Sequence, residues 1–230
     1  MIPLILFAAA ASGFETTVTE TGEAVKWRDF PVPFAVDLRD APDVLSEDEW
    51  LDAIEASFDM WASVDETKVQ FREAELVSGA GSISDGENTL WFETEWTDDP
   101  DVGAVASVWV DNTTIVGFDI RINAETVAWS VDGSETDAQA AVTHEVGHAL
   151  GIAHSQFEVA TMYYELTGDD VVRRNLDGDD ERAVSHLYSN RVLGVPKFLS
   201  CNTASQAGWS PWGLVAFLVV ARRKNQLGNS

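Results

Sequence analysis

Three histidines and one glutamate lie close together in the segment His144–His154, which reads HEVGHALGIAH. On a helix, His144 and His148 leave the same face one turn apart, so both imidazoles can bind one metal ion. Gly151 accepts the left-handed conformation that ends a helix, and the returning chain would bring His154 to the same ion. Three neutral nitrogens leave a fourth position for water, which is the pattern of a catalytic zinc and not of a structural one.

Glu145 adds the group that such a site needs for hydrolysis. It follows the first ligand directly, so its carboxylate can take the proton of a metal-bound water. The spacing therefore predicts one catalytic Zn²⁺ with Glu145 as the general base. The alternative is a buried helix whose histidines pair with carboxylates, but the added glycine and third histidine make the pattern rare by chance. His186, the remaining histidine, is expected to be a surface or packing residue.

The elements that must position this motif predict an α+β domain between about residues 25 and 191. Ser46 and Glu49 form a capping box, which marks the start of a helix of about four turns. Further helices are expected over residues 136–150 and from about residue 177. Strands are expected over residues 34–38, 69–71, 89–92, 104–110 and 115–122. This order predicts a twisted mixed sheet with three main helices.

The charge of the chain limits its partners. It has 14 basic and 39 acidic residues, a formal net charge of −25. Nucleic acid is therefore excluded as a partner, because phosphates would be repelled by most of the surface. The carboxylates of Asp98, Asp99, Asp101 and Asp111 make Ca²⁺ a second candidate ion, although a solvated acidic loop explains them equally well. The single cysteine, Cys201, excludes an intrachain disulfide.

The N-terminus has the pattern of an export signal. Residues 2–11 are apolar and too few to span a bilayer, and small residues follow them. Residues 1–13 are therefore interpreted as a signal peptide, followed by a short segment over residues 14–25. No Lys or Arg precedes the apolar block, and a buried N-terminal strand is the alternative.

The C-terminus has the pattern of a surface tail. Residues 191–207 are interpreted as a linker that contains Cys201. Residues 208–230 hold a short apolar run closed by Arg222, Arg223 and Lys224, as expected on a cytoplasmic flank. The cysteine, apolar run and basic cluster resemble the C-terminal sorting tails of myxobacterial surface proteins. A plain tail anchor and an amphipathic terminal helix are the alternatives.

The zinc motif also carries a family resemblance. HExxHxxGxxH followed by a methionine turn is the signature of the metzincins. Met162 stands eight residues after His154, and Ser155 follows the third histidine as in the matrixin branch, the matrix-metalloproteinase-like group. The segment from Leu176 to Tyr188 resembles the final helix of that branch. The resemblance spans about residues 27–188 and implies a zincin-like catalytic domain.

Several residue roles follow from this resemblance alone. Met162 would lie under the zinc as an apolar floor, and Asp179 and Asp180 would be structural residues of the final helix. The strand over residues 104–110 would be the sheet edge along which an extended substrate adds by main-chain hydrogen bonds. The residues implied in substrate binding are Ala104, Val105, Ala106, Tyr163 and Tyr164. For the tyrosines, ordinary core packing is the alternative, and Tyr164 also stands where other metzincins place a tyrosine near the metal.

Two features depart from the animal matrixins. Those proteins hold a second, structural zinc with additional histidines, and this chain has none left for it, so one zinc is expected. They are also kept latent by a propeptide cysteine, whereas Cys201 follows the domain. Latency by that route is therefore not expected.

The sequence predicts a secreted or cell-surface bacterial zinc endopeptidase. Its expected partners are a protein or peptide substrate and a machinery that sorts or processes the tail, and it is expected to be a monomer. Two other functions remain open. One is a surface adhesion or scaffold protein with a non-catalytic zinc, and the other is a zinc amidase that acts on cell-wall crosslinks.

Overall fold

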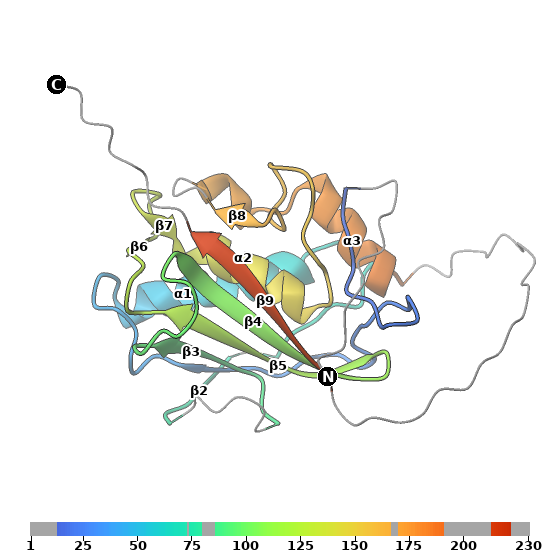
Figure 1. Ribbon diagram of the computed structural model, residues 1–230, viewed down its shortest axis with the longest axis horizontal. Coiled ribbons are helices and arrows are strands. Elements are labelled where there is room, and N and C mark those ends of the chain that lie inside the picture. Colours follow the sequence, from blue (N-terminus) through green and yellow to red (C-terminus); the bar gives the residue numbers. More distant parts are fainter. Residues whose placement is uncertain (1–12, 73, 80–85, 167–169, 191–212, 222–230) are drawn as a thin grey trace, which may run out of the picture.

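The computed structural model describes residues 13–72, 74–79, 86–166, 170–190 and 213–221 (Figure 1). The elements, in chain order, are β1 (Ala35–Asp37), α1 (Glu47–Ala62), β2 (Glu75–Leu76), β3 (Thr89–Glu93), β4 (Val102–Asp111), β5 (Thr114–Asn123), β6 (Trp129–Ser130), β7 (Thr136–Asp137), α2 (Ala138–Ala149), β8 (Glu165–Leu166), the 3₁₀ helix η1 (Asp170–Arg174), α3 (Gly178–Tyr188) and β9 (Gly213–Ala221). The three expected α-helices and the expected mixed sheet are confirmed.

Seven strands form the main sheet, in the order β2-β1-β3-β5-β4-β9-β8. The pairs β1–β3 and β3–β5 are parallel, while β4 is antiparallel to β5. The remaining strands, β6 and β7, form a separate two-stranded parallel pair. The long strands β4 and β5 are buried along most of their length, which explains why their apolar runs are visible in the sequence.

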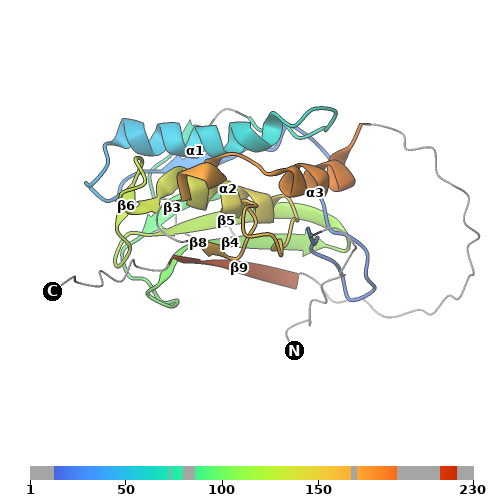
Figure 2. The ribbon, with the colours of Figure 1, turned by 90° about the horizontal axis from the view of Figure 1, so that it is seen from above.

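The helices form a layer on one side of the sheet (Figure 2). The capping box of α1 is present, since Glu49 N–H donates to the Ser46 side chain and Ser46 N–H donates to Glu49. The apolar face of α1 buries Trp50, Phe58 and Trp61 against α2 and the sheet. Trp61 also donates its indole N–H to a main-chain oxygen of α2, at 2.8 Å. Helix α2, which carries the zinc motif, therefore packs against both α1 and strand β4 of the sheet.

One expected strand is wrong. Residues 69–71 form a single β-bridge, between Val32 and Phe71, and the nearest strand is β2, four residues further on. The reason is that the chain just before this stretch is tied to the end of α3, where Lys68 N–H donates to the Tyr188 carbonyl. A contact between segments so far apart leaves no periodic pattern in the sequence.

The segment over residues 14–25 packs against the domain. Thr17 N–H donates to the Gly151 carbonyl at 2.8 Å, and Ala153 N–H donates to the Glu15 carbonyl at 3.0 Å. Val18 and Val25 are buried. This segment therefore supports the stretch that carries the third histidine. Residues 1–12, most of the expected signal peptide, lie outside the described residues.

Part of the expected tail joins the sheet. Residues 213–221 form β9, which lies along β4, the strand expected to be the substrate edge (Figure 1). With β9 in place, β4 is paired on both sides and is not the sheet edge that the family resemblance implies. The linker with Cys201 and the basic cluster lie outside the described residues. None of the helices in the described part of the chain combines the length and apolarity that a membrane crossing requires.

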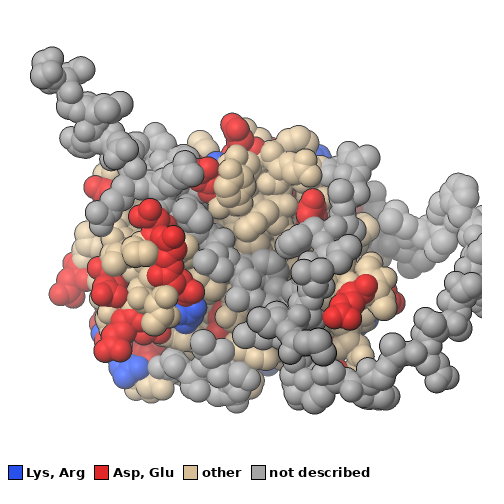
Figure 3. All heavy atoms as spheres, viewed as in Figure 1, with Lys and Arg blue, Asp and Glu red and all other residues tan. Residues whose placement is uncertain are grey.

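Acidic side chains greatly outnumber basic ones on the face shown in Figure 3. This agrees with the formal net charge of −25. Such a surface repels polyanions, as expected from the composition.

Candidate zinc site

Helix α2 begins at a buried carboxylate. The Asp137 side chain accepts the Ala140 N–H at 2.9 Å and thereby caps the helix. Asp137 is 2% exposed, and Arg174 donates its Nε to it at 2.9 Å. This ion pair joins the start of α2 to η1, so that one side chain neutralises the buried charge and holds the helix in place.

Helix α2 ends as the sequence predicts. Gly151 has a φ of +84°, the left-handed conformation that favours glycine. The Ile152 N–H donates to the Gly147 carbonyl and the Gly151 N–H to the His148 carbonyl, which is the Schellman arrangement. A Cβ at Gly151 would lie 2.5 Å from the Val25 carbonyl oxygen, so the position needs glycine for space as well as for its backbone.

The structure brings the three predicted ligands together. The Nε2 atoms of His144 and His148 are 2.9 Å apart, and those of His148 and His154 are 3.2 Å apart. Tetrahedral ligands at a zinc–nitrogen distance of about 2.0–2.1 Å lie about 3.3 Å from one another, so these separations fit one ion. Within the described residues, this is the one group of three or more His, Cys, Asp or Glu side chains arranged to hold a metal.

Main-chain oxygens determine which ring nitrogen His144 and His148 present to the metal position. The Thr161 carbonyl lies 2.7 Å from His144 Nδ1, and the Ile152 carbonyl lies 2.8 Å from His148 Nδ1. A carbonyl only accepts, so each Nδ1 carries the proton and each Nε2 presents its lone pair to the metal position. Burial lowers the pKa of both imidazoles well below the ordinary value, and it lowers the pKa of His154 to about 4. All three rings are therefore neutral, as ligands must be.

Glu145 is held beside this group. It is fully buried, and its Oε2 accepts the Ala106 N–H from β4 at 2.7 Å. Its other oxygen, Oε1, has no hydrogen-bond partner among the described atoms. Desolvation raises the pKa of this carboxyl well above its usual range. An unsatisfied buried oxygen on a strongly basic carboxylate fits a group that accepts a proton from a metal-bound water.

The methionine turn packs beneath the helix. Met162 is buried, and a Cβ at Gly147, between the two helical histidines, would lie 2.2 Å from its sulfur. The same Cβ would lie 2.8 Å from the Trp61 ring. Met162 therefore packs directly against α2, and Gly147 permits this close approach; its role as an apolar floor under the zinc stays a prediction.

Two buried carboxylates of α3 brace the turn. Asp180 accepts the N–H groups of Thr161 and Met162, at 2.8 and 3.1 Å. Asp179 accepts the Ser155 hydroxyl at 2.7 Å, next to the third histidine. Burial raises the pKa of Asp180 to about 6. Both aspartates therefore have the structural contacts expected of them, one on each side of the loop that carries the methionine.

The two tyrosines lie on the open side of the site. Tyr164 is exposed, and its ring centre is 6.5 Å from that of His154. Tyr163 is half-buried, and the Arg173 guanidinium lies 5.3 Å from the centre of its ring. Their placement at the end of the methionine turn is compatible with a pocket wall, which stays a prediction.

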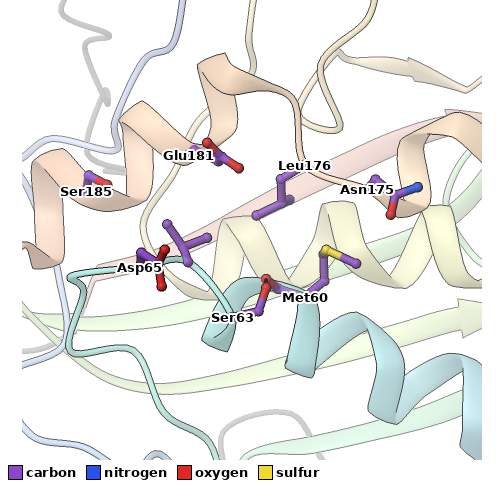
Figure 4. A pocket seen from close by; sticks show the side chains of 8 residues that line it. Met60, Ser63, Asp65, Asn175, Leu176, Glu181 and Ser185 are labelled. Carbon is purple, nitrogen blue, oxygen red and sulfur yellow. Dashed lines mark hydrogen bonds between the residues drawn. The ribbon is translucent and has the colours of Figure 1, made fainter.

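Other expected features lie apart from the histidines. The Asp98 carboxylate is paired with Arg121 at 2.7 Å, and the Asp99 carboxylate accepts the Asp101 N–H. These two carboxylates therefore have protein partners, and the calcium site stays a prediction. His186 is exposed and contacts the Phe14 ring, as expected of a surface residue. Figure 4 shows a pocket between the C-terminal end of α1 and α3, and no histidine lines it.

Sequence reasoning missed several residues that support the site. Thr161 and Ile152 act through main-chain oxygens, which leave no signal in residue type. Asp137 and Arg174 form an ion pair across 37 residues, which spacing cannot reveal. Gly147 could have been found from the sequence, because a glycine inside a predicted helix is unfavourable and usually indicates close packing at that position.

The fold and the site together define the class. An α+β domain with three convergent histidines, an adjacent glutamate and a methionine turn is a metzincin-type zinc domain. Residues 26–189 match the family model described as matrixin, and the chain belongs to the matrixin family. Family membership supports a zinc metalloendopeptidase.

Three relatives illustrate the similarity. The chain is 47% identical over 60 residues to karilysin from Tannerella forsythia, which covers 26% of this chain and 12% of that protein. It is 31% identical over 154 residues to matrix metalloproteinase-C from Caenorhabditis elegans, or 63% and 26% of the two chains. With human matrix metalloproteinase-26 the identity is 25% over 146 residues, or 61% and 51%. The chain thus spans about half or less of the length of these relatives.

Proposed function

We propose that the protein is a zinc-dependent endopeptidase that hydrolyses peptide bonds in protein or peptide substrates. The observation that carries this proposal is the placement of Glu145 beside three convergent imidazoles. A structural zinc has no use for a buried carboxylate with a free oxygen at this position. The same observation argues against a scaffold role, the first alternative.

The residues have separate tasks in the reaction. His144, His148 and His154 would hold the zinc, which when bound lowers the pKa of its water and polarises the scissile carbonyl. Glu145 accepts the water proton at its free Oε1 and passes it to the leaving amine. The Ala106 N–H holds Oε2, so that the carboxylate cannot rotate away from the attacking water. Burial excludes bulk water and keeps the carboxylate a strong base.

Substrate recognition follows from the strands beside the site. In the stretch Ala104, Val105 and Ala106, the Ala106 N–H donates to Glu145, so an extended peptide paired with this part of β4 would pass in front of the carboxylate. Tyr163 and Tyr164 would line the pocket for the side chain after the scissile bond. A zinc amidase that acts on cell-wall crosslinks would use the same centre, but such a substrate makes less use of a continuous strand edge.

Export and surface attachment complete the proposal. Support comes from the apolar block in residues 1–13 and from the apolar and basic residues in residues 208–230. Deletion from Gly208 onward is expected to release the protein into the medium, because the apolar run and its basic flank are lost. Unchanged cell association of the shortened protein would refute the surface tail.

The test of the activity uses purified full-length protein and an unstructured protein substrate. Cleavage is expected with zinc, is lost with a chelator and returns when zinc is added back. Crosslinked cell-wall fragments serve as the competing substrate. Stoichiometric zinc without cleavage of either substrate would favour the scaffold, and cleavage of the cell-wall fragments alone would favour the amidase.

A further inference from the structure

Strand β9 lies between β4 and β8 in the main sheet. It is antiparallel to β4 over the pairs from Val102–Val220 to Val110–Gly213, and parallel to β8 at Glu165–Val220 and Leu166–Ala221. Figure 1 shows β9 running beside β4 over the length of that strand. The position beside β4, here called the substrate channel, is thus occupied by an extended segment of the chain's own C-terminal region.

The register places the middle of β9 at the candidate active site. Ala106, whose N–H donates to Glu145, pairs with Phe217, and its neighbour Val105 pairs with Leu218. Strand β8 follows the methionine turn and pairs with the last two residues of β9, Val220 and Ala221. The main chain around Phe217 and Leu218 therefore runs past the base in the position where an extended substrate would add to β4.

We propose that residues 213–221 act as an intramolecular inhibitor that occupies the substrate channel. This inference rests on the proposed function, because it concerns the same edge of the sheet. One edge of β4 cannot pair with two strands at once, so a substrate must displace β9 before it can lie beside Glu145. The enzyme with its tail in place is therefore restrained.

The composition and length of the tail suit this role. Residues 213–221 read GLVAFLVVA, without charge and rich in strand-forming residues. Residues 191–212 join them to the end of α3 and can extend over about 70 Å, which is ample reach for a domain of this size. An apolar edge such as β4 would otherwise be open to pairing with other chains.

The covalent connection of β9 to the domain determines how strongly β9 inhibits the enzyme. Joining two segments in one chain gives the tethered segment an effective concentration of about millimolar at its site. A strand that binds the free channel with a dissociation constant of about 0.1 mM would then fill it about ten times more often than not. We expect removal of the tail to raise kcat/KM by about tenfold, mainly through a lower KM, because β9 competes with substrate for one channel. Any process that draws the tail elsewhere, including its engagement at a surface, would activate the enzyme.

A binding assay tests this inference without any turnover. The probe is a fluorescent peptide with the sequence of residues 213–221, flanked by lysines for solubility, and a scrambled peptide with the same flanks is its control. The probe is titrated into zinc-loaded Glu145→Gln protein, either full-length or ending at Asn190. Binding at least tenfold tighter to the shortened protein is expected. Equal affinity for both proteins, or equal binding of the scrambled peptide, would overturn the inference.

A proline variant tests the strand within the full chain. Ala216→Pro places proline in the middle of β9, where it disrupts a paired strand. Ser205→Pro is the matched control, because it adds a proline to the same tail ahead of β9. Ala216→Pro is expected to raise kcat/KM as truncation does, and Ser205→Pro to leave it unchanged. Identical activity in all forms would refute inhibition by the tail, whereas inactivity in all forms would refute the peptidase and leave the binding assay to decide the strand.

Discussion

Gly151 offers a sharp test of how the chain delivers the third histidine. Its φ of +84° is a conformation that L-residues rarely adopt. Alanine at this position would also place its Cβ 2.5 Å from the Val25 carbonyl oxygen and 3.3 Å from Ile115 Cδ1. The backbone cannot move away cheaply, because the Gly151 carbonyl accepts the Thr17 N–H at 2.8 Å. Gly151→Ala therefore combines a backbone cost with a steric cost.

These two costs can be separated by a matched variant. A left-handed conformation costs a non-glycine residue about 1–2 kcal/mol. Overpacking adds about 1–3 kcal/mol, so the free energy of unfolding should fall by about 2–5 kcal/mol in Gly151→Ala. Gly22 has a similar φ of +81°, but a Cβ added there would have no other atom within 4 Å. Gly22→Ala should therefore show the backbone cost alone.

Urea unfolding of the metal-free variants measures both values. Zinc affinity, measured by competition with a chelating dye, should fall about 10–100-fold in Gly151→Ala, because His154 lies three residues beyond the strained turn. Gly22→Ala should keep the zinc affinity of the unaltered protein. Unfolding free energies that agree within about 0.5 kcal/mol between the two variants would refute the steric argument.

Two further predictions concern α2 and the ligands. Asp137→Ala removes the cap of α2 and leaves Arg174 without its buried partner, so urea unfolding should show a loss of about 3–5 kcal/mol, against little change for the exposed Asp132→Ala. In the metal-free protein, the three ligand histidines should lower stability as the pH falls from about 6.5 toward 4, because the unfolded chain takes up protons that these buried rings resist. Glu145 and Asp180 oppose this loss, because burial raises the pKa of both carboxyls and they take up protons in the folded state in the same range. Each proton contributes a slope of about 1.4 kcal/mol per pH unit, so three histidines against two carboxyls leave a small net loss, and stability that rises as the pH falls over this range would contradict neutral, buried ligands.

The zinc motif could be predicted from sequence because its information is local. The spacing of His144, His148 and Gly151 encodes a helix and its end, and the observed turn has the expected left-handed glycine. The same holds for the capping box of α1 and for the long apolar strands β4 and β5. In each case, a few neighbouring residues determine the local conformation.

The parts that sequence reasoning missed depend on contacts between distant segments. The short strands β6, β7 and β8 contain only two residues each, which is too few for a periodic pattern. The contacts of Asp180 with the methionine turn join residues 18 and 19 positions apart, so spacing does not predict them, and only the family resemblance gave this aspartate a structural role. Residues 213–221 of the predicted C-terminal tail pair with β4, and hydrophobicity alone does not reveal such a pairing; the surface tail itself stays a prediction.

The central claim is that Glu145 is the base of a zinc peptidase, and one variant tests it most directly. Glutamine at this position keeps the size of the side chain and an oxygen that can accept the Ala106 N–H, but it cannot take a proton. Glu145→Gln should therefore fold normally and retain about one zinc per chain, while turnover of a peptide substrate falls by about two orders of magnitude or more. His148→Ala, the comparison, should lose zinc and stability together. Near-normal turnover by Glu145→Gln with full zinc, measured on the same sample, would contradict the account.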